Sequence, residues 1–311
     1  MLSYRKLAMR VLGRPLHTGG SDSPRPASQR AAAFVLTAAM LITLAAPAFA
    51  KEWYIEDGNI TVKAGDTKGT NKVSQGESTD VPDTDTVITN REKNASSNTV
   101  TIEAKDKDDK VEVTLKDVNI DTSSRNKAAV SVTGEGDTNI KLDGDNALKS
   151  DIYRSGIYGS GSGSLTISGG ENDSLTAQGG SGANGISSSG SLTISGGTVT
   201  ANGDDGGRGI YSRGGVTISG GTVTANGGDG SNVSGSGITS NGGVTISGGT
   251  VNAAGGSGSY GGNGIYSRSS LTISGGTVNA TGRDGKDGYG GGGIWSVILA
   301  DRSTKRHMYL E

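Results

Sequence analysis

The sequence has no cysteine, few aromatic residues and little proline, although it is 311 residues long. Without cysteine, no disulfide bond can brace the fold. Two phenylalanines and two tryptophans are too few for the core of an ordinary globular domain. Five prolines, with 55 glycines that do not recur at every third position, exclude a collagen triple helix. Such a glycine content is otherwise typical of disorder, so any order must come from repetition.

Residues suited to catalysis are also scarce. After residue 50 the only histidine is His307, and Glu171 is the only glutamate between Glu135 and Glu311. A glycosidase needs two carboxyl groups roughly 5–10 Å apart across the scissile bond, and the spacing singles out no such pair. The sequence therefore favours a protein without catalytic activity. A calcium-assisted lyase with an arginine base remains an alternative, and the candidates for that base are Arg154, Arg208, Arg213 and Arg268.

The first fifty residues have the pattern of a secretory signal peptide. Residues 1–30 hold six basic residues and one acid, and the apolar run AAAFVLTAAMLITLAAPAFA follows them. A basic segment, an apolar segment and the small residues of Ala48-Phe49-Ala50 predict cleavage after Ala50. The alternative is an uncleaved anchor, since about 20 apolar residues can just span a bilayer. No second run of that length follows, so we expect a secreted protein with no membrane segment after cleavage.

Loss of this segment changes the net charge. Of 29 basic and 31 acidic residues, six basic and one acidic residue are removed, which leaves 23 against 30 and a net charge of −7. A protein that binds nucleic acid would present a basic face instead. The composition therefore predicts no nucleic-acid partner.

A repeat dominates residues 151–295. Each copy has a Gly-Ile pair, then the hexapeptide Leu/Val-Thr-Ile-Ser-Gly-Gly, then a Leu/Val-x-Ala segment. In each piece aliphatic residues alternate with Thr, Ser, Tyr or Asn, which is the period of a half-buried strand. The five hexapeptides begin 24–28 residues apart, at Leu165, Leu192, Val216, Val244 and Leu271. A nearly fixed period of this length indicates stacked supersecondary units.

These features predict an all-β fold, a single-stranded parallel β-helix with about three short strands in each coil of 24–28 residues. Segments of variable length, such as NGDDGGRG and NGGDGSNVSGSG, would form loops at one corner of the stack. The right-handed form is the general preference for parallel crossovers. The repeat length excludes two other repeat folds, because calcium-binding β-rolls repeat every nine residues and a propeller blade needs about 40 residues.

The domain organisation follows from where the repeat is regular. After the signal peptide (1–50), residues 51–98 are polar with weak strand patterns, and we expect them to cap the first coil. Residues 99–295 form the β-helix, with irregular coils over 99–150 and regular repeats over 151–295. Residues 296–311 lack the repeat and are expected to form an irregular C-terminal tail.

The succession VTLKDVNI, NIKLDGDNALKS, GSGSLTISG and the recurring GGTVTANGG resembles a known family over residues 99–295. This family consists of secreted carbohydrate-binding β-helix domains of anaerobic Gram-positive bacteria. The resemblance implies a pectate-lyase-like fold without established catalysis. It also implies binding of cellulose-like or pectin-like glycans and of calcium. No individual binding residue is carried over from the family.

Candidate ligand-binding residues follow the isoleucine of the Gly-Ile pair. If this isoleucine points inward, its neighbour points outward, because successive residues of a strand face opposite ways. The aromatic residues at this position are Tyr158, Tyr211, Tyr266 and Trp295. They recur on nearly every second coil, about 9.6 Å apart at about 4.8 Å per coil, which suits stacking on an extended glucan. Two further candidates, Arg213 and Arg268, lie on the same face and would pair with uronate carboxylates. Alternatively, tyrosine simply suits an exposed strand.

Aspartates on the variable loops are candidate calcium ligands, and the predicted set is Asp204, Asp205 and Asp229. Hard cations prefer several converging carboxylate and carbonyl oxygens, which loops stacked at one corner can provide. The alternative is that these aspartates only form turns.

The sequence as a whole predicts a secreted, noncatalytic polysaccharide-binding protein, free or associated with the cell surface. Its expected partner is a plant cell-wall or other glycan, and its candidate cofactor is calcium. Two alternatives stay open, because one fold hosts many functions. The solenoid is either a structural spacer of a surface protein or adhesin, or the scaffold of the lyase considered above.

Overall fold

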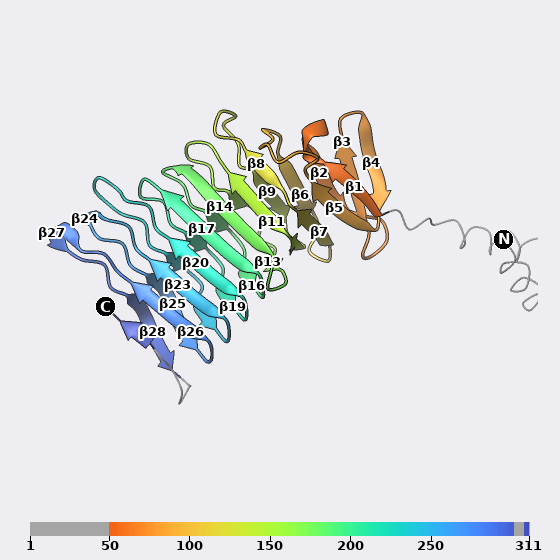
Figure 1. Ribbon diagram of the computed structural model, residues 1–311. Helices are drawn as coiled ribbons and strands as arrows, with labels where there is room; N and C mark the ends of the chain where they lie inside the picture. The colour runs from red at the N-terminus through yellow and green to blue at the C-terminus, as the bar shows by residue number, and fades with distance from the viewer. Residues whose placement is uncertain (1–49, 302–307, 311) are drawn as a thin grey trace, which may run out of the picture. The chain divides into compact units, whose positions relative to one another are not determined.

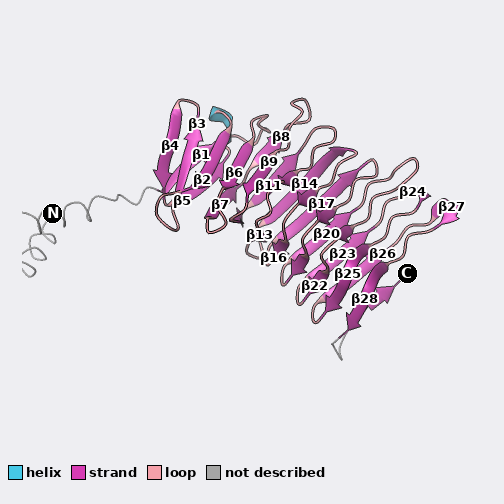
Figure 2. Cartoon of the chain, turned by 180° about the vertical axis from the view of Figure 1, so that it is seen from behind, coloured by secondary structure: helices cyan, strands magenta, loops and turns pink. Residues whose placement is uncertain are grey.

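The computed structural model of the chain describes residues 50–301 and 308–310, and the predicted signal peptide lies outside them except for Ala50. The described residues belong to the compact unit Ala48–Glu311. They are almost entirely strands and loops, with one short 3-10 helix, η1 (Ile55–Asp57), as Figure 2 shows. Within this described part, no helix is long and apolar enough to cross a membrane.

The chain winds through three parallel sheet faces in turn, and each coil stacks on the one before it (Figure 1). The first face consists of β2 (Ile60–Ala64), β6 (Val100–Ala104), β9 (Val130–Gly134), β12 (Ile157–Gly159), β15 (Ile186–Ser188), β18 (Ile210–Ser212), β21 (Ile238–Ser240) and the beginnings of β25 (Ile265–Ile273) and β28 (Ile294–Asp301).

The second face lies one corner further along each coil. It consists of β1 (Ala50–Tyr54), β5 (Asp85–Thr89), β7 (Lys110–Lys116), β10 (Asp137–Asp143), β13 (Leu165–Ser168), β16 (Leu192–Ile194), β19 (Val216–Ile218), β22 (Val244–Ile246) and the ends of β25 and β28. Because β25 and β28 run round the corner, the first two faces join in a single sheet.

The third face is a separate eight-stranded sheet. It consists of β8 (Asn119–Asp121), β11 (Asp145–Lys149), β14 (Ser174–Ser181), β17 (Thr198–Asp204), β20 (Thr222–Asn226), β23 (Thr250–Ala254), β26 (Thr277–Thr281) and β29 (Met308–Leu310). Three short parallel strands in each regular coil confirm the predicted parallel β-helix.

The core is a set of columns in which equivalent residues of successive coils lie over one another. On the first face the inward column contains Ile157, Ile186, Ile210, Ile238 and Ile265, all with 0% exposure. The second face adds the inward Leu/Val and Ile of each hexapeptide, and the third face adds the Leu/Val and Ala of each Leu/Val-x-Ala segment. One coil alone cannot bury these side chains, so the stack stabilises every coil in it.

Buried serines occupy the corner between the first and second faces. Strands β15, β18 and β21 each end in a buried serine, and in β18 and β21 this serine finds a carbonyl acceptor at the turn that follows. Ser212 Oγ donates to Gly215 O at 3.0 Å, and Ser240 Oγ donates to Gly243 O at 2.7 Å. Because a buried hydroxyl is costly unless it is hydrogen-bonded, this position suits serine and explains why polar residues recur inside the repeat.

Two of the glycine positions in the repeat have different structural roles. The second glycine of Ser-Gly-Gly turns the chain from the second face to the third with a positive φ, for example 74° at Gly221 and 77° at Gly249. Glycine adopts this conformation at little cost. The glycine of the Gly-Ile pair instead permits a close approach between coils, since a Cβ on Gly209 would lie 2.6 Å from Asn226 N.

The N-terminal segment adds an antiparallel element to the parallel stack. Strand β2 pairs in parallel with β6 on one side and antiparallel with β3 (Asn71–Gln75) on the other, and β3 pairs antiparallel with β4 (Ser78–Asp83). Trp53, on β1, is 2% exposed, and its indole N–H donates to the buried carboxylate of Asp83 at 2.7 Å. Residues 51–98 therefore contribute strands and core side chains as well as covering the first parallel coil.

At the other end, strand pairing extends past residue 295, into the segment expected to be irregular. Strand β28 pairs in parallel with β25 as far as Asp301, and β29 pairs with β26. The structure therefore differs from the expectation there. Parallel pairing uses only backbone donors and acceptors, so loss of the Ser-Gly-Gly motif does not end it.

Candidate functional site

The candidate aromatic residues lie in one outward column of the first face. In strand register, Tyr158 is followed by Ser187, Tyr211, Thr239, Tyr266 and Trp295 on successive coils. Tyr158 and Trp295 are exposed, whereas Tyr211 and Tyr266 are half-buried. Only the three tyrosines alternate with small residues. Trp295 lies on the coil next to Tyr266, and the two rings stack with centroids 4.5 Å apart and planes at 15°.

A groove of about 250 Å³ lies on this column around Thr239. Its floor and walls come from the first face and from the long loop before β21. The loop before β25 forms one further side. The lining residues are Arg208, Tyr211, Val233, Ser234, Ser236, Thr239, Asn241, Gly261, Gly262, Asn263, Tyr266 and Arg268. Of the six predicted ligand-binding residues, the groove brings together Tyr211, Tyr266 and Arg268.

Two arginines flank the groove, Arg208 and Arg268. Arg268 was predicted as a ligand-binding residue and Arg208 was not. Arg208 Cζ lies 5.1 Å from the centroid of the Tyr211 ring, and Arg268 Cζ lies 6.0 Å from that of Tyr266. Arg213 is exposed and does not line the groove. Strand alternation missed Arg208 because this residue comes from the loop before β18, where no two-residue period applies.

The groove has an excess of positive charge. Its lining contains two arginines and no aspartate or glutamate. Over residues 50–301 and 308–310, the ion pairs of the structure involve other basic residues, so neither guanidinium is neutralised by a carboxylate within 4.0 Å. An arginine guanidinium presents several N–H donors in a fixed fork. The groove therefore offers donors to the oxygen atoms of a ligand.

Two buried hydroxyl groups at the groove have no hydrogen-bond partner among the described residues: Thr239 Oγ1 and Ser234 Oγ. Thr239 is 3% exposed and Ser234 is 8% exposed. Thr239 points outward, between the coils of Tyr211 and Tyr266. Both oxygen atoms are closed off from solvent, so in this conformation they lie beneath the surface of the groove and a ligand would contact the tyrosine rings and guanidinium groups instead.

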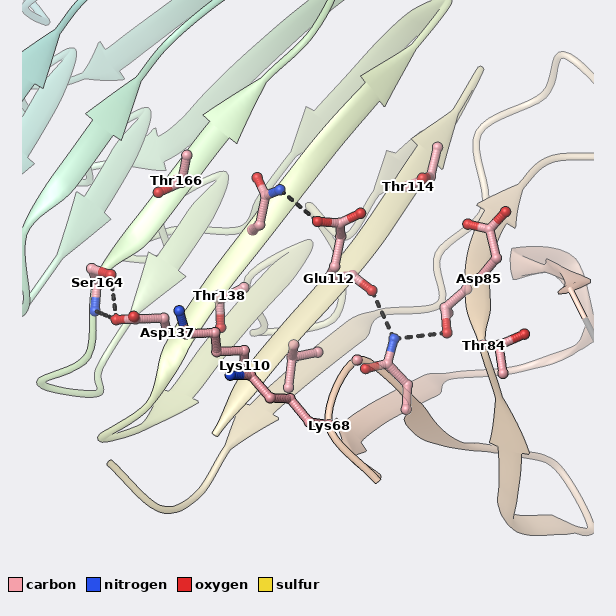
Figure 3. A pocket seen from close by; sticks show the side chains of 15 residues that line it. Lys68, Thr84, Asp85, Lys110, Glu112, Thr114, Asp137, Thr138, Ser164 and Thr166 are labelled. Atoms are coloured by element: carbon pink, nitrogen blue, oxygen red, sulfur yellow. Dashed lines mark hydrogen bonds between the residues drawn. The ribbon is translucent and has the colours of Figure 1, made fainter. Parts of the chain in front are cut away.

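A larger cleft of about 480 Å³ lies on the second face beside the N-terminal hairpin (Figure 3). Lysine and carboxylate side chains line it together, and no aromatic residue does. Several of its polar groups already bind one another, since Asn139 Nδ2 donates to Glu112 Oε2 at 2.9 Å and Ser164 donates to Asp137. The unpartnered Thr138 hydroxyl also lies at this cleft, in register between Val111 and Leu165. The smaller groove is therefore the better candidate.

Of the predicted calcium ligands, Asp204 ends β17 and the other two lie on loops, where each accepts a hydrogen bond from a neighbouring coil. Asp205 Oδ2 accepts from Ser181 Oγ at 3.0 Å, and Asp229 Oδ1 accepts from the Ser257 N–H at 2.6 Å. The part of the chain that the structure describes contains no group of three or more His, Cys, Asp or Glu side chains arranged to hold a metal ion. A calcium ion at Asp204, Asp205 and Asp229 would therefore need backbone carbonyl or water ligands as well, and the site stays a prediction.

Comparison with protein families gives one match. A family model described as carbohydrate-binding domain-containing protein matches residues 93–290, which is more than half of the chain and includes the whole groove. Comparisons with curated proteins and with solved structures gave no significant match.

Proposed function

The chain belongs to the family of carbohydrate-binding domain-containing proteins, and we propose that it binds a cellulose-like or pectin-like polysaccharide in the groove between Tyr211 and Tyr266 without cleaving it. The observation that carries this proposal is the presence in one groove of two tyrosine rings and two arginines that have no carboxylate partner among the described residues. Aromatic side chains supply a large apolar contact area, and the amide and guanidinium groups supply hydrogen bonds. A sugar, with apolar C–H faces and an edge of hydroxyl groups, needs both.

The electrostatics of the groove favour a ligand that carries oxygen acceptors. Arg208 and Arg268 lie beside the two tyrosines without an ion-pair partner among the described residues. A uronate carboxylate would accept charge-assisted hydrogen bonds from such a guanidinium, and a neutral glucan would offer its ring and hydroxyl oxygens. Uronate polymers and neutral glucans therefore both fit the proposal. Binding measured on one polymer of each class compares the two affinities directly.

Two further properties belong to this proposal. The basic and apolar pattern of residues 1–50 supports export, so the mature protein would act outside the cell, secreted or retained at the surface through partners. Binding without turnover agrees with the family description and with the scarcity of acid–base candidates in the sequence.

The test is binding to acid-swollen cellulose and to a pectate gel by the wild type and by Tyr211→Ala/Tyr266→Ala. We expect the double variant to lose about tenfold or more in affinity, because it removes the apolar contact area of two rings at about 25 cal/mol per Å² and about 1.4 kcal/mol is tenfold. Its melting temperature should fall only slightly, since both rings point away from the core and only surface contacts such as the stack of Tyr266 on Trp295 are lost.

Tyr153→Ala is a matched control for this experiment. Tyr153 is 78% exposed on a loop and lies outside the groove, so its removal should leave binding unchanged. If the double variant retains wild-type affinity, the groove is not the site. An assay of reducing ends and of unsaturated products on the same polymers checks the noncatalytic part, and product that accumulates with time would contradict it.

A further inference from the structure

The three long loops that precede β21, β25 and β28 carry a second row of exposed apolar side chains. Two of these loops contain short strands, β24 (Gly258–Tyr260) and β27 (Gly285–Tyr289), which lie side by side and pair in parallel (Figure 1). Val233 pairs with Tyr260, and Tyr260 pairs with Tyr289. Their side chains are 63%, 45% and 62% exposed. These three residues, the loop ladder, therefore lie in register on three successive coils.

The loop ladder accompanies the aromatic column on the first face. The sequence YGGNGIY runs from Tyr260 to Tyr266, and YGGGGIW runs from Tyr289 to Trp295, so each coil places one ring on the loop and one on the strand. The rings of equal position stack, since the Tyr260 and Tyr289 centroids are 5.0 Å apart and those of Tyr266 and Trp295 are 4.5 Å apart. Two neighbouring coils therefore carry two separate aromatic stacks.

Glycine separates the two stacks. Residues 261–264 and 290–293 are all glycine except Asn263. Close approach between coils explains these glycines, because a Cβ on Gly262 would lie 1.9 Å from Gly235 O and one on Gly291 would lie 2.0 Å from Gly262 O. As a consequence, a strip of backbone with almost no side chains lies between the two rows of rings.

The groove of the proposed function lies at one end of this strip. Its lining includes Val233 from the loop ladder and Tyr266 from the aromatic column, together with Gly261–Gly262 from the strip. Residues in register on parallel strands project to the same side of a sheet, so Tyr260 continues the side of the groove that begins at Val233. Trp295 continues the opposite side. The surface that the groove begins is therefore longer than the groove and runs along the stack.

Hydrogen bonds between the loops hold the loop ladder in place. The Gly261 N–H donates to Tyr289 O at 2.9 Å, and the Gly264 N–H donates to Gly292 O at 3.1 Å. The Gly292 N–H in turn donates to Asn263 Oδ1 at 2.8 Å. Groups that are already ordered lose little conformational entropy on binding, so rings on these loops are suited to a binding surface.

The chemistry of the two rows fits a polysaccharide. Clustered exposed apolar side chains mark interaction surfaces, and turn-forming residues are the ordinary occupants of such loops, so the tyrosines of the loop ladder are not explained by the fold alone. A pyranose ring has C–H bonds on both of its faces, and aromatic rings on two sides of a sugar chain can therefore contact the same stretch of it. The match to the carbohydrate-binding family extends to residue 290 and includes the whole loop ladder.

We propose that a polysaccharide chain lies lengthwise along the stack, on the strip between the loop ladder and the aromatic column, from the groove at Tyr211 to Trp295. This inference rests on the proposed function and extends its site over four coils. Tyr211 and Trp295 are three coil steps apart, or about 14.4 Å at about 4.8 Å per coil. The site is thus longer than one sugar residue and contacts successive residues within a chain.

Removal of the two loop rings tests this proposal. We expect Tyr260→Ala/Tyr289→Ala to lose at least about tenfold in affinity for whichever of acid-swollen cellulose and pectate gel the wild type binds, because the chain loses its apolar contact with two exposed rings. Ile152→Ala/Tyr153→Ala is the matched control. It removes two apolar side chains, 55% and 78% exposed, from an earlier loop at the same corner that does not line the groove, and it should bind as the wild type does.

Oligosaccharide length separates the loop ladder from the groove. With cello-oligosaccharides and oligogalacturonates in calorimetry, we expect wild-type affinity to rise with each added residue until the chain covers the strip. Tyr260→Ala/Tyr289→Ala should keep the affinity for the shortest oligosaccharides and lose the gain with length. Affinity that levels off at the disaccharide, or equal affinities of this variant and the wild type at every length, would overturn the lengthwise site and leave the groove in place. If Tyr211→Ala/Tyr266→Ala binds normally, the proposed function itself fails.

Tryptophan fluorescence examines the far end of the site without a substitution. The chain has two tryptophans, of which Trp53 is 2% exposed and Trp295 is 45% exposed, so quenching by acrylamide reports mainly on Trp295. A saturating hexasaccharide of the bound polymer should reduce this quenching, because the sugar chain covers the Trp295 ring. Quenching that the hexasaccharide leaves unchanged would show that the chain does not reach this coil and would overturn the proposal.

Discussion

Replacing Ile218 by alanine tests which side of the strands forms the core. Ile218 has 0% exposure and lies in register between Ile194 and Ile246, which are also fully buried. Ile→Ala substitutions in cores cost about 2–5 kcal/mol, depending on how far the cavity can collapse. Here the backbone ladder fixes the distance between coils, so the neighbouring isoleucines cannot move together to fill the space. We expect a loss of about 3–5 kcal/mol.

Urea unfolding followed by far-ultraviolet circular dichroism measures this loss. Thr217→Ala is the matched control, because Thr217 precedes Ile218 on the same strand and points outward. It should change the free energy of unfolding by about 0.5 kcal/mol or less. Ile218→Asp would place an unpaired carboxylate in the same position, and we expect it to prevent folding of the stack. Equal effects of Ile218→Ala and Thr217→Ala, or a larger effect of Thr217→Ala, would refute the assignment of the two faces.

Three further predictions concern other parts of the chain. Trp53→Phe should destabilise the N-terminal segment by about 1.5–3 kcal/mol, because the buried Asp83 carboxylate loses its indole donor; equal urea midpoints for the variant and the wild type would contradict this. Hydrogen bonding from Arg91 lowers the pKa of Asp57 from its usual 3.8, so the contribution of this pair is complete above pH 3.8 and is lost as the pH falls through the folded-state value. Thermal melts of Asp57→Asn should therefore depend less on pH than those of the wild type below about pH 4. If Asp204, Asp205 and Asp229 bind calcium, EDTA should lower the melting temperature by linkage, and identical melts with calcium and with EDTA would remove that site.

The regular part of the fold follows from the sequence because the repeat fixes the register. The alternation of Ile157 with Tyr158, and of each later pair, determines which residue points inward, since a shift by one residue would expose the whole inward column. The same argument gives the outward column and, beside it, Arg268, whereas the predicted Arg213 does not line the groove. The buried serines at the first corner were visible as a recurring Ser two residues after the Gly-Ile isoleucine, but only the structure identifies the carbonyl groups that they bind.

What the sequence did not predict lies where no period applies. Arg208 reaches the groove from a loop, and Ser234 and Val233 do so from a loop of different length. Loop backbones are determined by local turns and by contacts with neighbouring loops, neither of which repeats along this chain. The antiparallel pairing of β3 with β2 was missed for a related reason, because residues 51–98 do not share the repeat that sets the register elsewhere.

The placement of the groove agrees with how a solenoid distributes its stability. Burying Thr239 Oγ1 and Ser234 Oγ without partners costs about 1–3 kcal/mol for each group, which is a large fraction of the roughly 5–15 kcal/mol that stabilises an ordinary domain. In a solenoid the stability is approximately a sum of terms for single coils and for the interfaces between neighbours. The coil that carries Thr239 has a complete set of inward residues, Ile238, Val244, Ile246 and Val251, each at most 1% exposed. The cost of the outward polar groups is therefore offset within the same coil. A binding groove can form on the outer surface of such a coil without weakening the register of the coils around it.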